Sequence, residues 1–188
     1  MYKRQELDGA TGRSIRAAER ELVRRMVHRY ESAMAARTTG TDDGIDAALV
    51  RRVARAELKD TSTSSGENVF SMMRRIGQAK AGLAADYAAQ LARSAGKVVF
   101  FAKHVDVMDI AEQTFAQRGL GYSSIRGDQT SSVRQKNIDA FVNDREVAVA
   151  VCSLLAAGVG VNLQVASNVV LAELSWTCLL YTSPSPRD

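Results

Sequence analysis

The pattern of hydrophobic and polar positions changes once along the chain, close to Gly96. Before Gly96, apolar residues recur every three or four positions, as at Leu22, Met26 and Tyr30, which is typical of amphipathic helices. After Gly96, short runs of β-branched and aromatic residues appear, beginning with residues 98–102, and such runs are typical of strands buried on both faces. The pattern therefore predicts an all-helical segment followed by an α/β region.

Two polar stretches that contain glycine, residues 38–44 and 61–66, interrupt the helical segment. Flexible residues of this kind end helices. Helices are expected at residues 15–34, 45–58 and 69–76, and Val23 and Val27 widen the apolar stripe of the first. Leu83, Tyr87 and Leu91 continue the helical spacing, and Gly96 stands where a glycine commonly ends a helix.

The region after Gly96 alternates strands with helices. Strands are predicted at residues 98–102, 122–125, 147–152 and 169–173, and the first, third and fourth are expected to be buried. The first two connections carry helical patterns, and Ser132 with Gln135 resembles a capping box at the start of the second helix. Strands that alternate with helices in this way are typical of a parallel sheet flanked by helices.

Composition excludes several classes of protein. No apolar run approaches the roughly 20 residues of a membrane-spanning helix, and the first residues lack the apolar stretch of a secretory signal. We therefore expect a soluble cytoplasmic chain that contacts no membrane, associated with the nucleoid if it is bacterial. Two cysteines and two histidines without metal-ligand spacing argue against a zinc site. The net charge of +4 permits a polyanionic partner without identifying one.

The carboxyl ends of parallel strands are where such sheets bind ligands, so three places stand out: His104, Gly127-Asp128 and the loop after Ser153. In that loop, Gly158 and Gly160 would let the backbone approach another molecule closely. Its N–H groups could receive phosphate oxygens, and the Ser153 and Asn162 side chains add hydrogen-bonding groups at its two ends. The alternative is a tight strand-to-helix turn without a ligand.

Three blocks occur in a specific order: residues 97–104, residues 125–128 with Arg134 and Phe141, and residues 153–163 followed by 169–176. This set resembles the C-terminal motor lobe of the SWI/SNF-type ATPases, the double-stranded-DNA translocases of helicase superfamily two. Within them it is most similar to the branch of the annealing helicases and their bacterial relatives. The resemblance covers Lys97 to Trp176, whereas residues 1–96 resemble the helical lead-in only loosely.

The resemblance implies a RecA-like lobe that clamps ATP against a second lobe while both follow the DNA backbone. It puts three residues at the interlobe nucleotide, namely Gly158, Gly160 and Asn162. It puts three others at or beside the DNA, namely Gly127, Arg134 and Ser153. Leu155 departs from the family, which usually carries a polar or basic residue there. Without the resemblance, Arg134 is a helix-surface charge, His104 a capping residue and Trp176 a core anchor.

The expected organisation is a helical connector at 1–96, an incomplete C-terminal lobe at 97–177, and a tail at 178–188 that lacks regular structure. Pro184 and Pro186 block helix and strand in that tail, which resembles translated adapter sequence. The sequence shows no G-x-x-x-x-G-K-[ST] phosphate loop, no Walker B acids and no arginine-finger motif. The resemblance therefore implies double-stranded DNA and a missing N-terminal RecA-like lobe of the same polypeptide as partners. ATP and Mg²⁺ would serve the intact enzyme, and this chain alone is expected to bind neither and to leave ATP unhydrolysed.

Two other functions stay open at this point. A Rossmann-like nucleotide-binding enzyme would need a glycine-rich turn after its first strand, and residues 102–105 contain no glycine. A non-catalytic adaptor could bind DNA or protein through the arginine-rich N-terminal helices.

Overall fold

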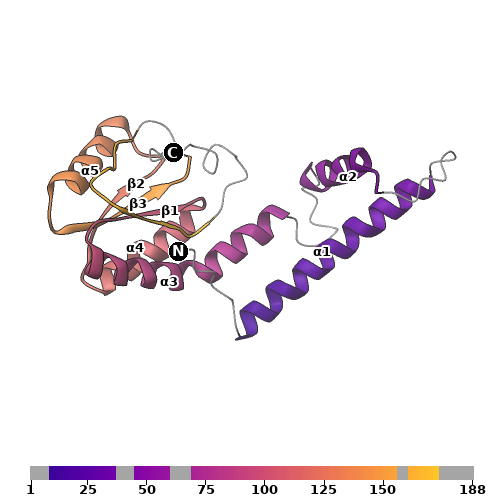
Figure 1. Ribbon diagram of the computed structural model, residues 1–188, viewed down its shortest axis with the longest axis horizontal. Helices are drawn as coiled ribbons and strands as arrows, with labels where there is room; N and C mark the ends of the chain where they lie inside the picture. Colours follow the sequence, from indigo (N-terminus) through magenta and orange to yellow (C-terminus); the bar gives the residue numbers. More distant parts are fainter. Residues whose placement is uncertain (1–8, 37–44, 60–68, 156–160, 174–188) are drawn as a thin grey trace. The chain divides into compact units, whose positions relative to one another are not determined.

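The computed structural model describes residues 9–36, 45–59, 69–155 and 161–173. The chain divides into two compact units, Met1–Ala79 and Lys80–Asp188. Helix α3 (Val69–Ala95) begins in the first unit and ends in the second (Figure 1). No helix in the described ranges is long and apolar enough to cross a membrane.

In the first unit, α1 (Gly9–Ala35) packs against α2 (Ala47–Lys59). The Glu57 carboxylate is buried between them and pairs with Arg25 at 3.3 Å and Arg29 at 2.9 Å. Val23 and Val27 are about half exposed, so they do not widen the buried stripe of α1 as the sequence suggested. The interface between these helices therefore contains a buried carboxylate that forms salt bridges with two arginines of α1.

The second unit is built on a four-stranded sheet in the order β2-β3-β1-β4, and every neighbouring pair is parallel. The strands are β1 (Val98–Ala102), β2 (Gly121–Ile125), β3 (Val147–Ser153) and β4 (Asn168–Leu171). Helix α4 (Val105–Gln117) and the second half of α3 cover one face, and α5 (Ser131–Asn143) covers the other (Figure 1). The predicted α/β class and parallel sheet are confirmed.

The second half of α3 packs on the sheet through alanines rather than through its large apolar residues. Leu83 is 50% exposed and Tyr87 is 36% exposed. The buried residues are Ala81, Ala84, Ala85, Ala88, Ala89 and Ala92. Small side chains let a helix approach a sheet closely, and this packing joins residues 80–95 to the sheet unit. The compact units accordingly divide at residues 79 and 80, where the sequence suggested 96 and 97.

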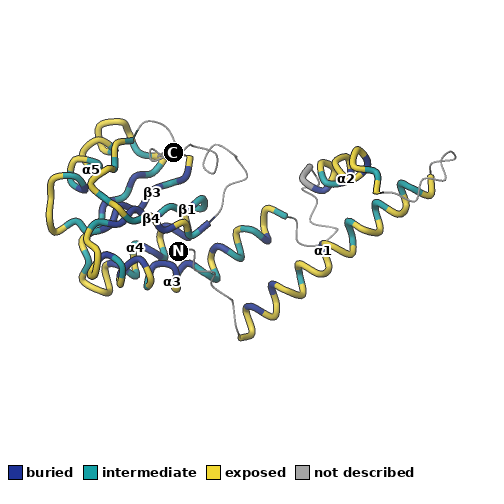
Figure 2. Tube along the Cα trace, in the orientation of Figure 1, coloured by how far each residue is buried: buried dark blue, intermediate teal, exposed yellow. Residues whose placement is uncertain are grey.

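Strand β4 lies at the edge of the sheet and is only partly covered (Figure 2). Val170 is buried, but Val169 is 57% exposed and Leu171 is 44% exposed. The prediction of a fully buried last strand was wrong for these two residues. The physical reason is that α5 packs over β2 and β3 and leaves the same face of β4 open.

Lys97 joins the amino end of the sheet to the end of α5. Its Nζ donates to the backbone carbonyls of Phe141, Asp144 (2.6 Å) and Val147 (3.0 Å) and lies 5.0 Å from the centre of the Phe141 ring. Burial lowers the pKa of Lys97, although the nearby Asp144 carboxylate acts in the opposite direction. One ammonium thus connects the end of α5 with the starts of β1 and β3.

Candidate functional site

The carboxyl ends of the four parallel strands lie together along one side of the sheet, which is termed the carboxyl edge. Pairing continues past the strand ends, because the Leu154 N–H donates to the Ala102 carbonyl and the Ala172 N–H donates to the Phe101 carbonyl, both at 2.9 Å. Ser153 pairs in register with Ala102 and is half-buried. The edge is therefore a continuous backbone surface, with the Ser153 hydroxyl at the end of β3.

The turn between β2 and α5 is held by two side-chain amides. The Ser124 carbonyl accepts from Asn137 Nδ2 at 2.6 Å and from Gln129 Nε2 at 3.0 Å. Gln129 Oε1 in turn accepts from the Arg126 N–H at 3.0 Å. These three bonds fix the path of residues 126–130, so Gly127 has a defined position after β2.

Helix α5 begins two residues earlier than the proposed capping box requires. Thr130 is the N-cap residue, and its hydroxyl accepts from the Val133 N–H at 3.4 Å. Ser132 lies inside the first turn, so the expectation for Ser132 was wrong. The Thr130 cap is effective because its backbone is extended, as an N-cap requires.

Arg134 carries a positive charge that no carboxylate in the described ranges neutralises. Its Nη2 donates to the carbonyls of Gln129 at 3.2 Å and Gly127 at 3.5 Å. Its Nε is buried without a hydrogen-bond partner among the described residues. The predicted pair Gly127 and Arg134 is thus brought together, and the guanidinium is held by neutral groups that leave its charge available to an anion.

Arg126, eight positions earlier, is the opposite case. Its Nη2 lies 2.6 Å from Asp109 Oδ1 and 2.7 Å from Glu112 Oε1. Burial opposes its charge, but the bonds to these two carboxylates raise the pKa of Arg126 above its ordinary value. The charge of Arg126 is therefore neutralised by carboxylates of the same unit, and Arg134 is the better candidate for contact with a ligand.

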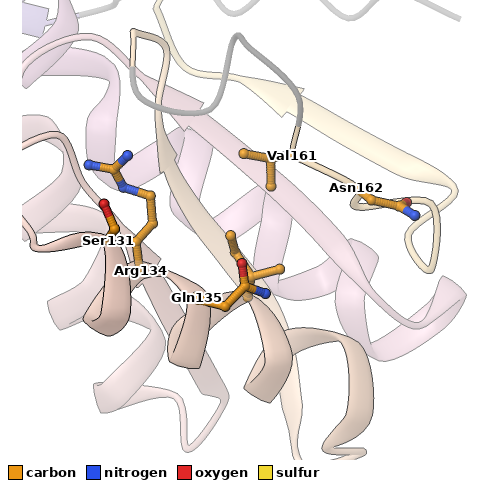
Figure 3. A pocket seen from close by; sticks show the side chains of 6 residues that line it. Ser131, Arg134, Gln135, Val161 and Asn162 are labelled. Atoms are coloured by element: carbon orange, nitrogen blue, oxygen red, sulfur yellow. The ribbon is translucent and has the colours of Figure 1, made fainter.

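A hollow of about 360 Å³ lies beside the first turns of α5 (Figure 3). Ser131, Arg134, Gln135 and Ile138 form its helical wall, and Val161 and Asn162 form the wall across from it. Asn162 Oδ1 accepts from the Gln164 N–H at 3.2 Å, so its amide nitrogen keeps its donors. The structure thus places the predicted DNA residue Arg134 and the predicted nucleotide residue Asn162 on one hollow, which Ser153 does not line.

Gly158 and Gly160 lie outside the described residues, as do Trp176 and the tail at 178–188. Leu155, where the sequence departs from the family pattern, is described and is 78% exposed. A side chain there contributes no hydrogen-bonding group to the edge.

Glu173 is a feature of the edge that the sequence reasoning missed. The residue is 8% exposed, and its Oε2 accepts from the backbone N–H groups of Lys103 at 2.7 Å and His104 at 2.9 Å. Its Oε1 lies 2.6 Å from His104 Nδ1. His104 is the N-cap residue of α4 by position, but its side chain makes no capping bond and pairs with Glu173 instead. An acid within the apolar run 169–174 was the available signal, because buried carboxylates are normally paired.

The donors on this edge suit the oxygens of a phosphate. Arginine offers a planar fork of N–H groups, and hydroxyl and amide groups add single bonds. Across the described ranges, no group of three or more His, Cys, Asp or Glu side chains is placed to hold a metal ion. Among the described residues, the edge thus combines the Arg134 guanidinium, which no carboxylate neutralises, with neutral donors.

Residues 83–183, just over half of the chain, match the family described as helicase conserved C-terminal domain. Among solved structures, the C-terminal part of the Fun30 ATPase domain aligns with a TM-score of 0.51 at 14% identity, covering 90% of this chain and 73% of that one. This likeness shows a shared fold.

Curated proteins of known sequence include several relatives. "DNA annealing helicase and endonuclease ZRANB3" of Homo sapiens is 32% identical over 109 residues, which are 57% of this chain and 10% of that protein. A Caenorhabditis elegans protein, "SWI/SNF-related matrix-associated actin-dependent regulator of chromatin subfamily A-like protein 1 homolog", is 42% identical over 78 residues, 42% of this chain and 11% of that protein. The chain thus spans about a tenth of the length of these relatives.

Proposed function

Because the chain belongs to the helicase conserved C-terminal domain family, we propose that it forms the second RecA-like lobe of an ATP-dependent double-stranded-DNA translocase of the SWI/SNF type. In this role the carboxyl edge of its sheet holds the DNA backbone. Relatives named as a DNA annealing helicase and as a SWI/SNF-related protein support this proposal. A first RecA-like lobe of the same polypeptide supplies the phosphate loop and the acids for Mg²⁺.

The observation that carries the proposal is that the Arg134 guanidinium is bonded to neutral groups and keeps its positive charge. Its guanidinium is held by the Gly127 and Gln129 carbonyls and meets no carboxylate in the part of the chain that the structure describes. It lies in the first turn of α5, where the helix dipole also favours an anion. A phosphate oxygen can take up the remaining N–H donors of the guanidinium. Contacts of this kind position the DNA backbone without reading base sequence, as a translocase requires.

The turn residues have a positioning role in this proposal. Asn137 and Gln129 hold the Ser124 carbonyl and thereby fix Gly127, whose carbonyl holds Arg134. The Ser153 hydroxyl adds a donor to the same edge at the end of β3. Loss of either amide would therefore displace Arg134 without removing its charge.

The nucleotide contacts are proposed for Gly158, Gly160 and Asn162. ATP, when bound, supplies the free energy that closes and opens the two lobes. The amide nitrogen of Asn162 fits a phosphate or ribose oxygen, because its N–H groups are not used in the local turn. The two glycines are proposed on their sequence positions alone.

The Rossmann-like alternative is disfavoured by the turn after β1. A dinucleotide-binding fold uses the N–H groups of that turn for the pyrophosphate. Here the N–H groups of Lys103 and His104 already donate to the buried Glu173 carboxylate. A negatively charged ligand would face that carboxylate, so this turn is unsuited to phosphate.

The test is the salt dependence of duplex binding by this chain, measured by fluorescence anisotropy. Each lost phosphate contact lowers the slope of log K against log salt by about 0.9. We expect Arg134→Gln to lower the slope by about this amount. The matched control is Arg145→Gln, because Arg145 is exposed and precedes β3 at the opposite edge of the sheet. Equal slopes for the two variants would contradict the proposed site.

A further inference from the structure

Helix α2 presents an arginine-rich face that packs against none of the described residues of the first unit. Leu49, Val53 and Glu57 are its buried residues, at helical spacing along one side. Arg51, Arg52 and Arg55 are exposed and lie on other faces of the same helix. These three residues are termed the α2 arginine patch. Figure 2 shows α2 exposed along much of its length.

The arginines of the patch have no carboxylate partner among the described residues, whereas three arginines of α1 do. Arg25 and Arg29 pair with the buried Glu57 of α2. Arg24 pairs with Glu21 one turn earlier in α1. The Glu57 carboxylate of α2 is thus buried on the side of the helix away from the patch. The patch therefore concentrates three positive charges within about one turn and a half.

The patch lines a hollow in the described part of the first unit. A hollow of about 610 Å³ is lined by the three arginines together with Ala48 and Ala56. Alanines place no bulky side chain between the guanidinium groups, so a ligand can reach all three. None of these lining residues is a large apolar side chain of the kind that anchors a protein partner.

We infer that the α2 arginine patch is a second binding site for the phosphate backbone of duplex DNA. The inference rests on the proposed function for its choice of DNA as the polyanion. Arg51 and Arg55 are four residues apart, which is about 6 Å along the helix axis. Phosphates of one DNA strand follow at about 3.4 Å of duplex axis, so phosphates two steps apart are separated by about 6.8 Å along the axis. The axial spacing of the two arginines is close to this value. One guanidinium group can donate two parallel hydrogen bonds to the oxygens of a phosphate, which favours arginine at such a surface.

The experiment measures duplex binding by the full chain over a series of salt concentrations. One variant carries Arg51→Gln, Arg52→Gln and Arg55→Gln, and a second carries lysine at the same three positions. The control removes an equal charge elsewhere, through Arg13→Gln, Arg20→Gln and Arg145→Gln, all of which are exposed positions. Far-UV circular dichroism confirms that each variant keeps its helices.

The glutamine variant is expected to lower the salt slope by about 2 to 3, from about 0.9 for each lost phosphate contact. The lysine variant is expected to keep the slope near its original value because it keeps the charges. If the triple glutamine variant misfolds, the salt slopes of the lysine variant and of the three single glutamine substitutions test the inference instead. Equal losses in the glutamine variant and in the control would overturn the inference, because net charge alone would then explain binding. Binding to poly-glutamate as tight as binding to duplex would also overturn it, in favour of an acidic protein partner.

These measurements test the DNA contact of Arg134 and the DNA contact of the α2 arginine patch independently. If Arg134→Gln lowers the slope and the glutamine variant of the α2 arginine patch does not, the inference is wrong and the proposed function stands. If only the patch variant lowers the slope, the assignment of Arg134 is wrong and the patch stands.

Discussion

Replacement of Gly121 by alanine should destabilise the sheet unit through a clash that the backbone cannot avoid. A Cβ on Gly121 would lie 2.1 Å from the carbonyl oxygen of Glu146, 2.9 Å from its carbonyl carbon and 3.3 Å from the Cα of Val147. All three atoms belong to the backbone, so no side-chain rotation relieves the contact. The register of β2 on β3 is irregular between Gly121 and Tyr122, and the close approach occurs there.

The expected loss in the free energy of unfolding is about 2 to 3 kcal/mol, the upper part of the range for overpacked sites. Gly82→Ala is the matched control, because a Cβ at Gly82 meets nothing within 4 Å. Gly82 lies inside α3, where alanine is better than glycine by about 0.5–1 kcal/mol. The same substitution should thus have opposite signs at the two positions.

Urea denaturation followed by far-UV circular dichroism measures both effects. With slopes of about 1–3 kcal/mol/M for small proteins, a loss of this size moves the midpoint by about 1 M or more. A Gly121→Ala protein as stable as the parent would refute the close approach of β2 and β3. A destabilised Gly82→Ala protein would refute the description of α3 as one continuous helix with open space at that position.

Three further predictions concern other parts of the chain. Lys97→Met removes a charged donor from three backbone carbonyls, so the free energy of unfolding should fall by about 2 kcal/mol, on the scale of hydrogen bonds to charged groups; an unchanged urea midpoint would contradict this. Burial raises the pKa of the Cys152 thiol to about 12 from an ordinary 9.0. In a Cys178→Ser chain, the Cys152 thiol should therefore react with thiol reagents at pH 8 only after unfolding. Its stabilising effect relative to Cys152→Ala should be complete below pH 9 and be lost as the pH rises to about 12; rapid labelling of the folded chain would refute its burial. Grafted into a complete two-lobe relative, Gly158→Val and Gly160→Val should abolish DNA-stimulated ATPase with native-like circular dichroism, since valine disfavours close approach and positive φ; wild-type ATPase would remove these glycines from the site.

The parallel sheet could be predicted from the sequence because its strands are short apolar runs separated by helical patterns. Most of the β1 run at 98–102 and of the β3 run at 147–152 is buried as expected, because both strands lie inside the sheet. Phe101, Val147 and Ala148 are only partly buried. The exposure of Val169 and Leu171 could not be predicted, since it depends on which strand lies at the edge. That order is a property of the tertiary structure.

The packing face of α3 shows a second limit of sequence patterns. Leu83 and Tyr87 belong to the apolar spacing that predicted the helix, yet it is the alanine face of α3 that packs on the sheet. Hydrophobicity ranks leucine above alanine, whereas close packing of a helix on a sheet favours the smaller side chain. The pattern therefore predicted the helix correctly but not its buried side.

The candidate site was predictable where chemistry follows the carboxyl ends of strands. Gly127 and Arg134 are close in sequence, so a turn and one helical turn bring them together. The contact of His104 with Glu173 joins residues almost 70 positions apart and depends on β1 and β4 being neighbours. Nothing local in the sequence indicates such a pair.

If Arg134 holds the DNA backbone in a working motor, its loss should weaken the response of the ATPase to duplex DNA. This is measured as DNA-stimulated ATPase in a complete two-lobe relative that carries this lobe, with Arg134→Gln compared with Arg145→Gln. We expect the duplex concentration for half-maximal ATPase to rise about tenfold or more for Arg134→Gln, since a charged hydrogen bond contributes about 1.5–3 kcal/mol. Arg145→Gln should leave this concentration unchanged. An unchanged duplex requirement in the Arg134→Gln protein would contradict the account.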